Sequence, residues 1–313
     1  MPEINIEEKI QEALKKKSFK ENKLEYLGLA LIFCLMLFST FVVGYFVPLM
    51  SILVFFLVDI PLIMGFKHFI WFGPASGETL IDGFRVSLVC GYLNFISYFK
   101  IFITSNVKAI IASIVTFLVS TVAGTFILES VLAEQFNQIL QVAGTDYQLL
   151  IEMMFENDAI STGILVVEFV SIALAVLGFY FVKLNRSLLP YVSFLRLTNL
   201  EGKSMEGVIS HTSRILKAKR WGYYMSATLY HLLYLIPLGA AVGVFFLMSS
   251  NPVYSPVTIE LITFLVFFIC AFPAVLFVEL NNRKYCIEAN QEYLKEHKKM
   301  LNDAMNDLNK NKR

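Results

Sequence analysis

A nearly uninterrupted apolar run from Tyr26 to Gly65 constrains the fold of this chain more than any other feature. A helix needs about 20 apolar residues to cross the hydrocarbon core of a bilayer, and this run has about twice that length. Gly44 and Pro48 interrupt the run near its middle, in the sequence GYFVP. Because both residue types disfavour a continuous helix, the pattern predicts a tight hairpin of two membrane spans.

Four further apolar runs follow, and composition supports reading them all as spans. The chain is 57% hydrophobic and 16% charged, whereas a soluble domain is about 45–50% apolar and about 25% charged. We therefore expect an all-α integral membrane protein with a cytoplasmic amphipathic arm (1–25), a membrane domain (26–282) and a cytoplasmic C-terminal helix (283–313). The six spans are expected at about 26–44, 47–66, 108–130, 159–182, 222–247 and 258–280.

The placement of charge predicts the orientation of these spans. All 26 Lys and Arg residues lie in the two end segments and in the connections after the second and fourth expected spans. The 130–158 connection carries only acidic charges, and the 249–257 connection carries none. Because cytoplasmic loops are enriched in Lys and Arg, both termini are expected in the cytoplasm of a bacterium, with the protein in its cytoplasmic membrane. The first 25 residues lack the apolar segment of a cleaved signal peptide, so the first span is expected to act as an uncleaved anchor.

The segment 86–107 is also long enough to span. A seventh span there would place the acidic 130–158 connection inside and the Lys- and Arg-rich connection that follows residue 182 outside, which the positive-inside rule disfavours. Large apolar residues recur in it at helical spacing, beside a face of small and polar residues. This pattern predicts an amphipathic helix at the inner membrane interface, with re-entrant packing against the bundle as the alternative. The apolar set is Leu88, Tyr92, Phe95, Phe99 and Phe102, and the small or polar set is Ser87, Gly91, Asn94, Ser97 and Ser105.

A basic cluster precedes the fifth expected span. Residues 204–219 have the periodicity of a cytoplasmic amphipathic helix, which leads into Lys217, Lys219, Arg220 and Trp221. Cations and a tryptophan at this point are typical of lipid-headgroup contacts. Nucleic-acid binding is disfavoured because no aromatic platform or nucleic-acid-binding motif accompanies the cluster.

Two parts of the chain resemble a known family. LPYV at 189–192, followed by GKSMEGVISHTSRILKAKRWGYY and an apolar span ending in LIPLG, is similar to the second half of an uncharacterised bacterial multi-span membrane protein family. PLIMGFKHF at 61–69 and SGETLIDGFR at 76–85 resemble its first half. That family is related to the membrane domain of some glycerophosphoryl diester phosphodiesterases. The resemblance implies a membrane architecture and carries no catalytic residue to this chain.

Three ionisable residues lie within expected spans and form the candidate intramembrane polar site: Asp59, Glu168 and His231. A charge at such depth costs about 2.5–3.5 kcal/mol on insertion scales, so each side chain is expected to face the bundle interior or water. They could form a proton relay or cation pathway, or a hydrogen-bonded structural network. Glu168 and His231 are expected to approach each other, because both fall near the membrane midplane.

The sequence otherwise predicts no enzyme, metal site or cofactor. It holds no Gly-rich phosphate loop, GxSxG or HExxH motif, and its cysteines, Cys34, Cys90, Cys270 and Cys286, are not expected to form disulfides. After residue 283, Ile287, Leu294, Leu301 and Leu308 recur every seven residues, as in a weak coiled coil or a surface helix. We therefore expect a non-enzymatic accessory, assembly or lipid-associated factor that contacts the lipid bilayer and another membrane protein. The alternative is a transporter or a permease subunit served by a cytoplasmic ATPase.

Overall fold

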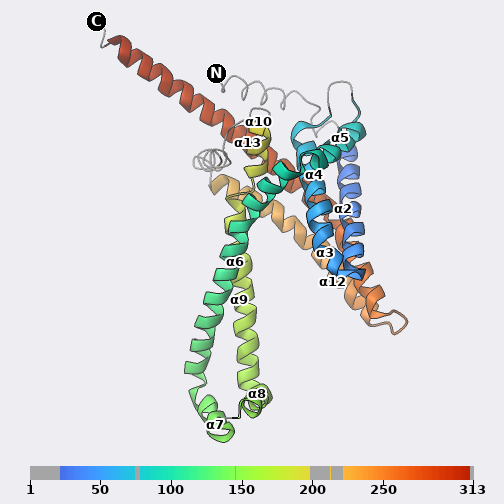
Figure 1. The fold of residues 1–313 in the computed structure, drawn as a ribbon, viewed down its shortest axis with the longest axis vertical. Helices are drawn as coiled ribbons and strands as arrows, with labels where there is room; N and C mark the ends of the chain where they lie inside the picture. Colours follow the sequence, from blue (N-terminus) through green and yellow to red (C-terminus); the bar gives the residue numbers. More distant parts are fainter. Residues whose placement is uncertain (1–21, 75–77, 145, 198–211, 213–220, 311–313) are drawn as a thin grey trace. The chain divides into compact units, whose positions relative to one another are not determined.

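The computed structural model describes residues 22–74, 78–144, 146–197, 212 and 221–310 (Figure 1). Within these residues every element is a helix. The described helices include 6 that are long and apolar enough to cross a membrane. The prediction of an all-α protein with six apolar spans is thereby confirmed. These spans are Lys23–Phe46, Met50–Phe72, Phe95–Val131, Asp158–Phe194, Trp221–Ser249 and Pro256–Glu292.

The chain divides into two compact units. The first unit comprises Met1–Ile103 and Ser187–Arg313, and the second comprises Thr104–Arg186. The long helix α6 (Phe95–Val131) contributes its beginning to the first unit and the rest to the second.

The predicted hairpin begins the first unit. Helix α2 (Lys23–Phe46) is followed by its C-cap residue Val47, and Pro48 opens helix α3 (Pro48–Val54), where its missing N–H and fixed φ are favourable. Gly44 allows the two helices to approach, because an added Cβ would lie 3.1 Å from the Ser51 Cβ. The second arm continues through a π-helical turn, η1 (Phe55–Asp59), into α4 (Ile60–Phe72). It ends at Gly73, whose φ of 62° favours glycine, rather than near residue 66 as expected.

The segment 86–107 is divided differently from the expectation. Helix α5 (Leu80–Leu93), capped by the Thr79 side chain, ends at Asn94, and α6 runs without a break through residue 107. The small face of α5 is the buried one: an added Cβ on Gly91 would lie 2.2 Å from the Pro61 carbonyl oxygen of α4. Ser87 is also buried, whereas Tyr92 and Leu93 are exposed. Helix α5 therefore packs against α4 through Ser87 and Gly91, as is common between membrane helices. Further along the segment, the rings of Phe99 and Phe102 contact Phe56 and Phe55 of η1.

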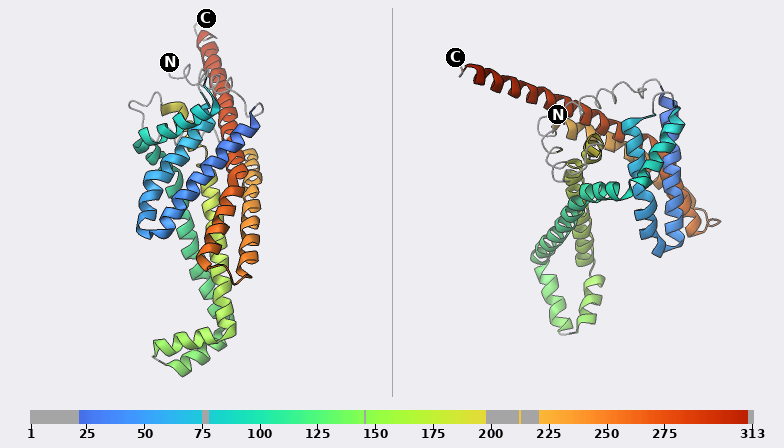
Figure 2. Two further views of the ribbon diagram at one scale, coloured as in Figure 1. Left: turned by 90° about the vertical axis from the view of Figure 1, so that its right-hand side faces the viewer. Right: turned by 45° about the horizontal axis from the view of Figure 1, so that its top comes forward.

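Helix α13 (Pro256–Lys310) is the longest element and organises the first unit. It packs along α12 (Leu235–Ser249) and α2, and it also contacts α4 and α10 (Leu189–Leu197). The views in Figure 2 show α2, α12 and α13 side by side. The largest fully buried side chains of this unit lie in two places. Trp71 of α4 packs against Tyr191 of α10, and Tyr223 of the 221–231 helix packs against Tyr285 of α13. Phe66 and Phe69 of α4 pack against α2 and α5.

The second unit is a long helical hairpin of α6 and α9 (Asp158–Leu184) (Figures 1 and 2). Glycines allow close packing: an added Cβ on Gly124 would lie 2.6 Å from Val167, and one on Gly163 would lie 2.3 Å from Leu128. The acidic connection between the two helices forms two short helices, α7 (Ala133–Ala143) and α8 (Tyr147–Glu156). The Asp146 and Asn157 side chains cap α8 and α9 by accepting hydrogen bonds from backbone N–H groups.

Candidate functional site

A largely buried ion pair joins α4 to α13. The Lys67 ammonium group contacts Oε1 of Glu279, and the two side chains are 17% and 14% exposed. The two residues lie 212 positions apart in the sequence. This pair therefore joins the second candidate span to the last one.

The second oxygen of the Glu279 carboxylate is held by two neutral donors. The Tyr191 hydroxyl of α10 donates to Oε2 at 2.7 Å, and the Asn282 amide donates to the same atom at 3.3 Å. Tyr191 is fully buried, and its ring centroid lies 5.9 Å from Lys67 Nζ, a favourable cation–π distance. Both carboxylate oxygens are thus engaged, which offsets part of the cost of burying the charge.

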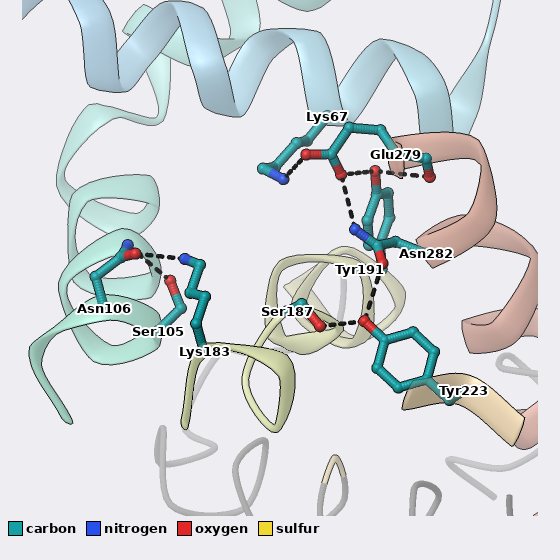
Figure 3. Close-up of polar contacts among 9 residues, drawn as sticks. All are labelled: Lys67, Ser105, Asn106, Lys183, Ser187, Tyr191, Tyr223, Glu279 and Asn282. Carbon is teal, nitrogen blue, oxygen red and sulfur yellow. Dashed lines mark hydrogen bonds and ion pairs between the residues drawn. The ribbon is translucent and has the colours of Figure 1, made fainter. Parts of the chain in front are cut away.

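The contacts continue to the beginning of the fifth span. The Tyr223 hydroxyl donates to Oδ1 of Asn282 at 2.9 Å and also contacts the Ser187 hydroxyl. Since the Tyr223 proton is directed to Asn282, Ser187 is the donor in the second contact. These six residues form the Lys67–Glu279 network: Lys67, Ser187, Tyr191, Tyr223, Glu279 and Asn282 (Figure 3).

Sequence reasoning missed the Lys67–Glu279 network. Lys67 counted only as a cytoplasmic charge, and Glu279, at the end of the last expected span, was not singled out. The cluster Glu279, Asn281 and Asn282 at the end of an apolar run was the available signal, because such polar groups are rarely buried without partners. Asn281 also has a partner, since the Ser226 hydroxyl donates to its Oδ1 at 2.8 Å.

Asp59, the first predicted site residue, lies at the wall of a cavity. Its Oδ1 accepts a hydrogen bond of 2.6 Å from the Thr40 hydroxyl of α2. The cavity has a volume of about 420 Å³, and its remaining walls are mainly aromatic and aliphatic. Asp59 is the last residue of the π-helical turn η1, a local distortion that is frequent at functional sites. The lining includes Thr40, Phe41, Tyr45, Phe55, Asp59 and Phe268.

The three predicted polar-site residues, Asp59, Glu168 and His231, are divided between the two units. Glu168 lies on an exposed part of α9 in the second unit, whereas Asp59 and His231 belong to the first. The His231 ring nitrogen Nδ1 lies 2.6 Å from the Ala227 carbonyl oxygen of its own helix. Convergence of Glu168 and His231 therefore stays a prediction.

Of the predicted headgroup contacts, Trp221 is described and is 78% exposed. Its ring packs against Tyr224 at a centroid distance of 6.2 Å. Lys217, Lys219 and Arg220 lie outside the described residues, as does most of the predicted 204–219 helix. Lipid binding by this cluster stays a prediction.

The second unit contains a separate polar contact between its two long helices. The Lys183 ammonium group donates to Oδ1 of Asn106, whose amide donates to the Ser105 hydroxyl at 3.2 Å (Figure 3). All four cysteines are free. Within the described ranges, no group of three or more His, Cys, Asp or Glu residues is arranged to hold a metal ion.

These features define a polytopic α-helical membrane protein. Comparison of the chain with protein-family models, curated proteins and solved structures finds no match. The resemblance to the family related to phosphodiesterase membrane domains therefore stays a prediction, and the function has to be argued from the residues themselves.

Proposed function

We propose that this protein is a non-enzymatic accessory or assembly factor of a bacterial cytoplasmic membrane, which holds a partner through its C-terminal helix. One observation carries the proposal: α13 continues as a single helix from the last span to Lys310. At a rise of about 1.5 Å per residue, the part beyond Glu292 extends roughly 27 Å further. A rigid extension of this kind supports a docking role.

The polar network supports the same role. In the Lys67–Glu279 network, the charged groups are bound to one another and to neutral groups of the chain. Such pairing fixes the base of α13 against α4 and α10. A rigid base beneath a long helix favours the display of that helix to a partner.

The heptad-spaced residues of α13 allow a direct test. Ile287 is buried in the first unit, so the variants are placed further along the helix, at Leu301 and Leu308. Because a coiled-coil seam does not tolerate charge, the double variant Leu301→Asp with Leu308→Asp should lose a partner that co-purifies with the unmodified protein in mild detergent. Quantitative mass spectrometry of the purified complexes measures this loss.

The matched control for that test is Lys295→Asp, an exposed residue of the same helix that lies outside the heptad positions. It makes the chain more negative by the same amount as the double variant, because a cation is replaced by an anion, and it should retain the partner. Retention of the partner by the double variant would contradict the proposal, as would the absence of any partner from cross-linked preparations of the unmodified protein.

The proposed orientation places both termini in the cytoplasm. In a background without native cysteines, Gln148→Cys in α8 and Val253→Cys, at a residue that is 82% exposed, should react with an impermeant maleimide in intact cells. Lys295→Cys should react only after the cells are permeabilised. Labelling of Lys295→Cys in intact cells, or protection of Gln148→Cys, would contradict the six-span orientation.

A transporter or permease subunit is the second candidate. It is favoured by Asp59, a carboxylate that lies at the wall of an apolar cavity within the expected membrane span. Ionisable residues at such depth commonly mark substrate or ion pathways. Transport would require a ligand to cross the membrane, whereas the accessory function would not.

A further inference from the structure

The lining of the cavity beside Asp59 contains one acidic residue and no Lys or Arg. The sequence has no Lys or Arg between Lys23 and Lys67, and none between Arg220 and Arg283. Every residue that lines the cavity falls within these two intervals. Thr40 donates one hydrogen bond to the carboxylate but brings no positive charge.

A second carboxylate stands close to the cavity. The Tyr45 hydroxyl, whose residue lines the cavity, donates to Oε2 of Glu260 on α13. Glu260 is exposed, so its charge is screened by solvent or lipid headgroups more than that of Asp59. The charges near the cavity therefore have the same sign, which favours a cationic occupant.

The walls determine what kind of cation fits. Phe41, Phe55 and Phe268 line the cavity, and the Phe41 and Phe268 ring centroids are 6.1 Å apart. Aromatic faces attract cations, and they also match apolar groups attached to a cation. Metal ions such as Ca²⁺ take six or more oxygen ligands, a number that this mainly hydrocarbon wall does not offer.

The apolar surface continues beyond the rings of Phe41 and Phe268. The same two side chains line a second cavity of about 620 Å³ between α2, α12 and α13. Its other walls include Leu238, Val242 and Phe264, and its described lining contains a single hydroxyl residue, Thr263. A ligand with its positive charge at Asp59 can therefore place a large apolar group against this second surface.

We propose that the cavity beside Asp59 is a binding site for hydrophobic organic cations, with Asp59 as the counter-ion and Phe41, Phe55 and Phe268 as the apolar walls. Thr40 orients the carboxylate through its hydrogen bond. This binding does not depend on the accessory function, because it involves the hairpin and the membrane part of α13 rather than the C-terminal end of that helix.

The test uses two ions of nearly the same shape and opposite charge. The intact protein in an uncharged detergent is equilibrated with tetraphenylphosphonium or with tetraphenylborate, and bound ion is measured by equilibrium dialysis. The cation should bind saturably and at least about tenfold more tightly than the anion, a difference of about 1.4 kcal/mol. Equal affinities would overturn the proposal and leave a nonspecific apolar groove.

Variants then assign the charge to its residue. Asp59→Asn should weaken tetraphenylphosphonium binding by about tenfold or more, whereas Glu152→Gln, which removes an exposed carboxylate of α8 in the second unit, should leave it unchanged. Unchanged binding in Asp59→Asn would overturn the assignment, as would a loss confined to Glu260→Gln. If Asp59→Asn does not fold, the comparison of the two ions in the unmodified protein still tests whether the cavity selects cations.

Discussion

Replacing Glu279 by alanine should lower the free energy of unfolding by about 3–5 kcal/mol, because it leaves the buried Lys67 ammonium group without its counter-ion. The Tyr191 hydroxyl and the Asn282 amide lose their acceptor in the same step. Lys67→Ala should have a similar effect, since the buried carboxylate then lacks its cation. Chemical or thermal unfolding of the purified protein in detergent micelles measures both changes.

A double variant that removes both charges separates two contributions to stability. One is the cost of leaving a single charge buried without a partner, and the other is the net contribution of the ion pair. Lys67→Met combined with Glu279→Gln should recover a large part of the stability lost in either alanine variant, because no unpaired charge is buried. The matched control is Lys284→Met on α13, which breaks an exposed pair with Glu288 at 3.9 Å. Breaking such a surface pair should cost less than about 1 kcal/mol. Equal effects of Lys67→Ala and Lys284→Met would show that the Lys67–Glu279 pair is not structural.

The sequence predicts the six spans but not the Lys67–Glu279 network. Span number depends on local composition, and the apolar runs are long enough for hydropathy alone to indicate six helices. Pairing of Lys67 with Glu279 depends on which two helix ends meet after the chain has folded. Neither segment has a local pattern that encodes this pairing, and the positive charge of Lys67 is equally consistent with a topological role alone.

Periodicity likewise predicted a two-sided helix in segment 86–107 but did not decide which side faces the protein. In water, the large apolar side would be buried and the small polar side exposed. Within a membrane protein the lipid accepts large apolar side chains, so close packing falls to the small residues. Ser87 and Gly91 are buried for this reason, and the Ser87 hydroxyl lies 3.1 Å from Nδ1 of His68 on α4.

Asp59 was recognised from sequence as an ionisable residue within a span, but its cavity was not. The cavity depends on the π-helical turn at Phe55–Asp59 and on the approach of Phe268 from α13, far away in the sequence. Neither feature has a local signature. Depth can therefore be predicted from position along a span, whereas the surroundings of the side chain follow only from the packing of three helices.

The contact between α4 and α5 leaves no room for a side chain at its two glycines, Gly65 and Gly91. An added Cβ at Gly91 would meet the Pro61 carbonyl oxygen at 2.2 Å, and one at Gly65 would meet the Leu88 Cα at 2.9 Å. Both obstacles are backbone atoms, which cannot move without separating the helices. Gly91→Ala should therefore cost about 1–3 kcal/mol, the usual range for overpacking, and Gly91→Leu should cost more.

A local measurement shows whether Gly91→Leu separates these helices or merely weakens the whole protein. Cys90 neighbours Gly91 on α5 and is half-buried, so in a background where it is the sole cysteine its maleimide reaction rate should rise when α5 is displaced. The control is Gly243→Leu on α12, where an added Cβ meets nothing within 4 Å. Since leucine also has the better helix propensity, by up to about 1 kcal/mol, this control should keep its stability and its slow Cys90 reaction. If Gly91→Leu matches the control in both stability and Cys90 reaction rate, α5 does not pack on α4 through its small face. That result would instead favour a helix in segment 86–107 that is held at the membrane interface by its large apolar side chains.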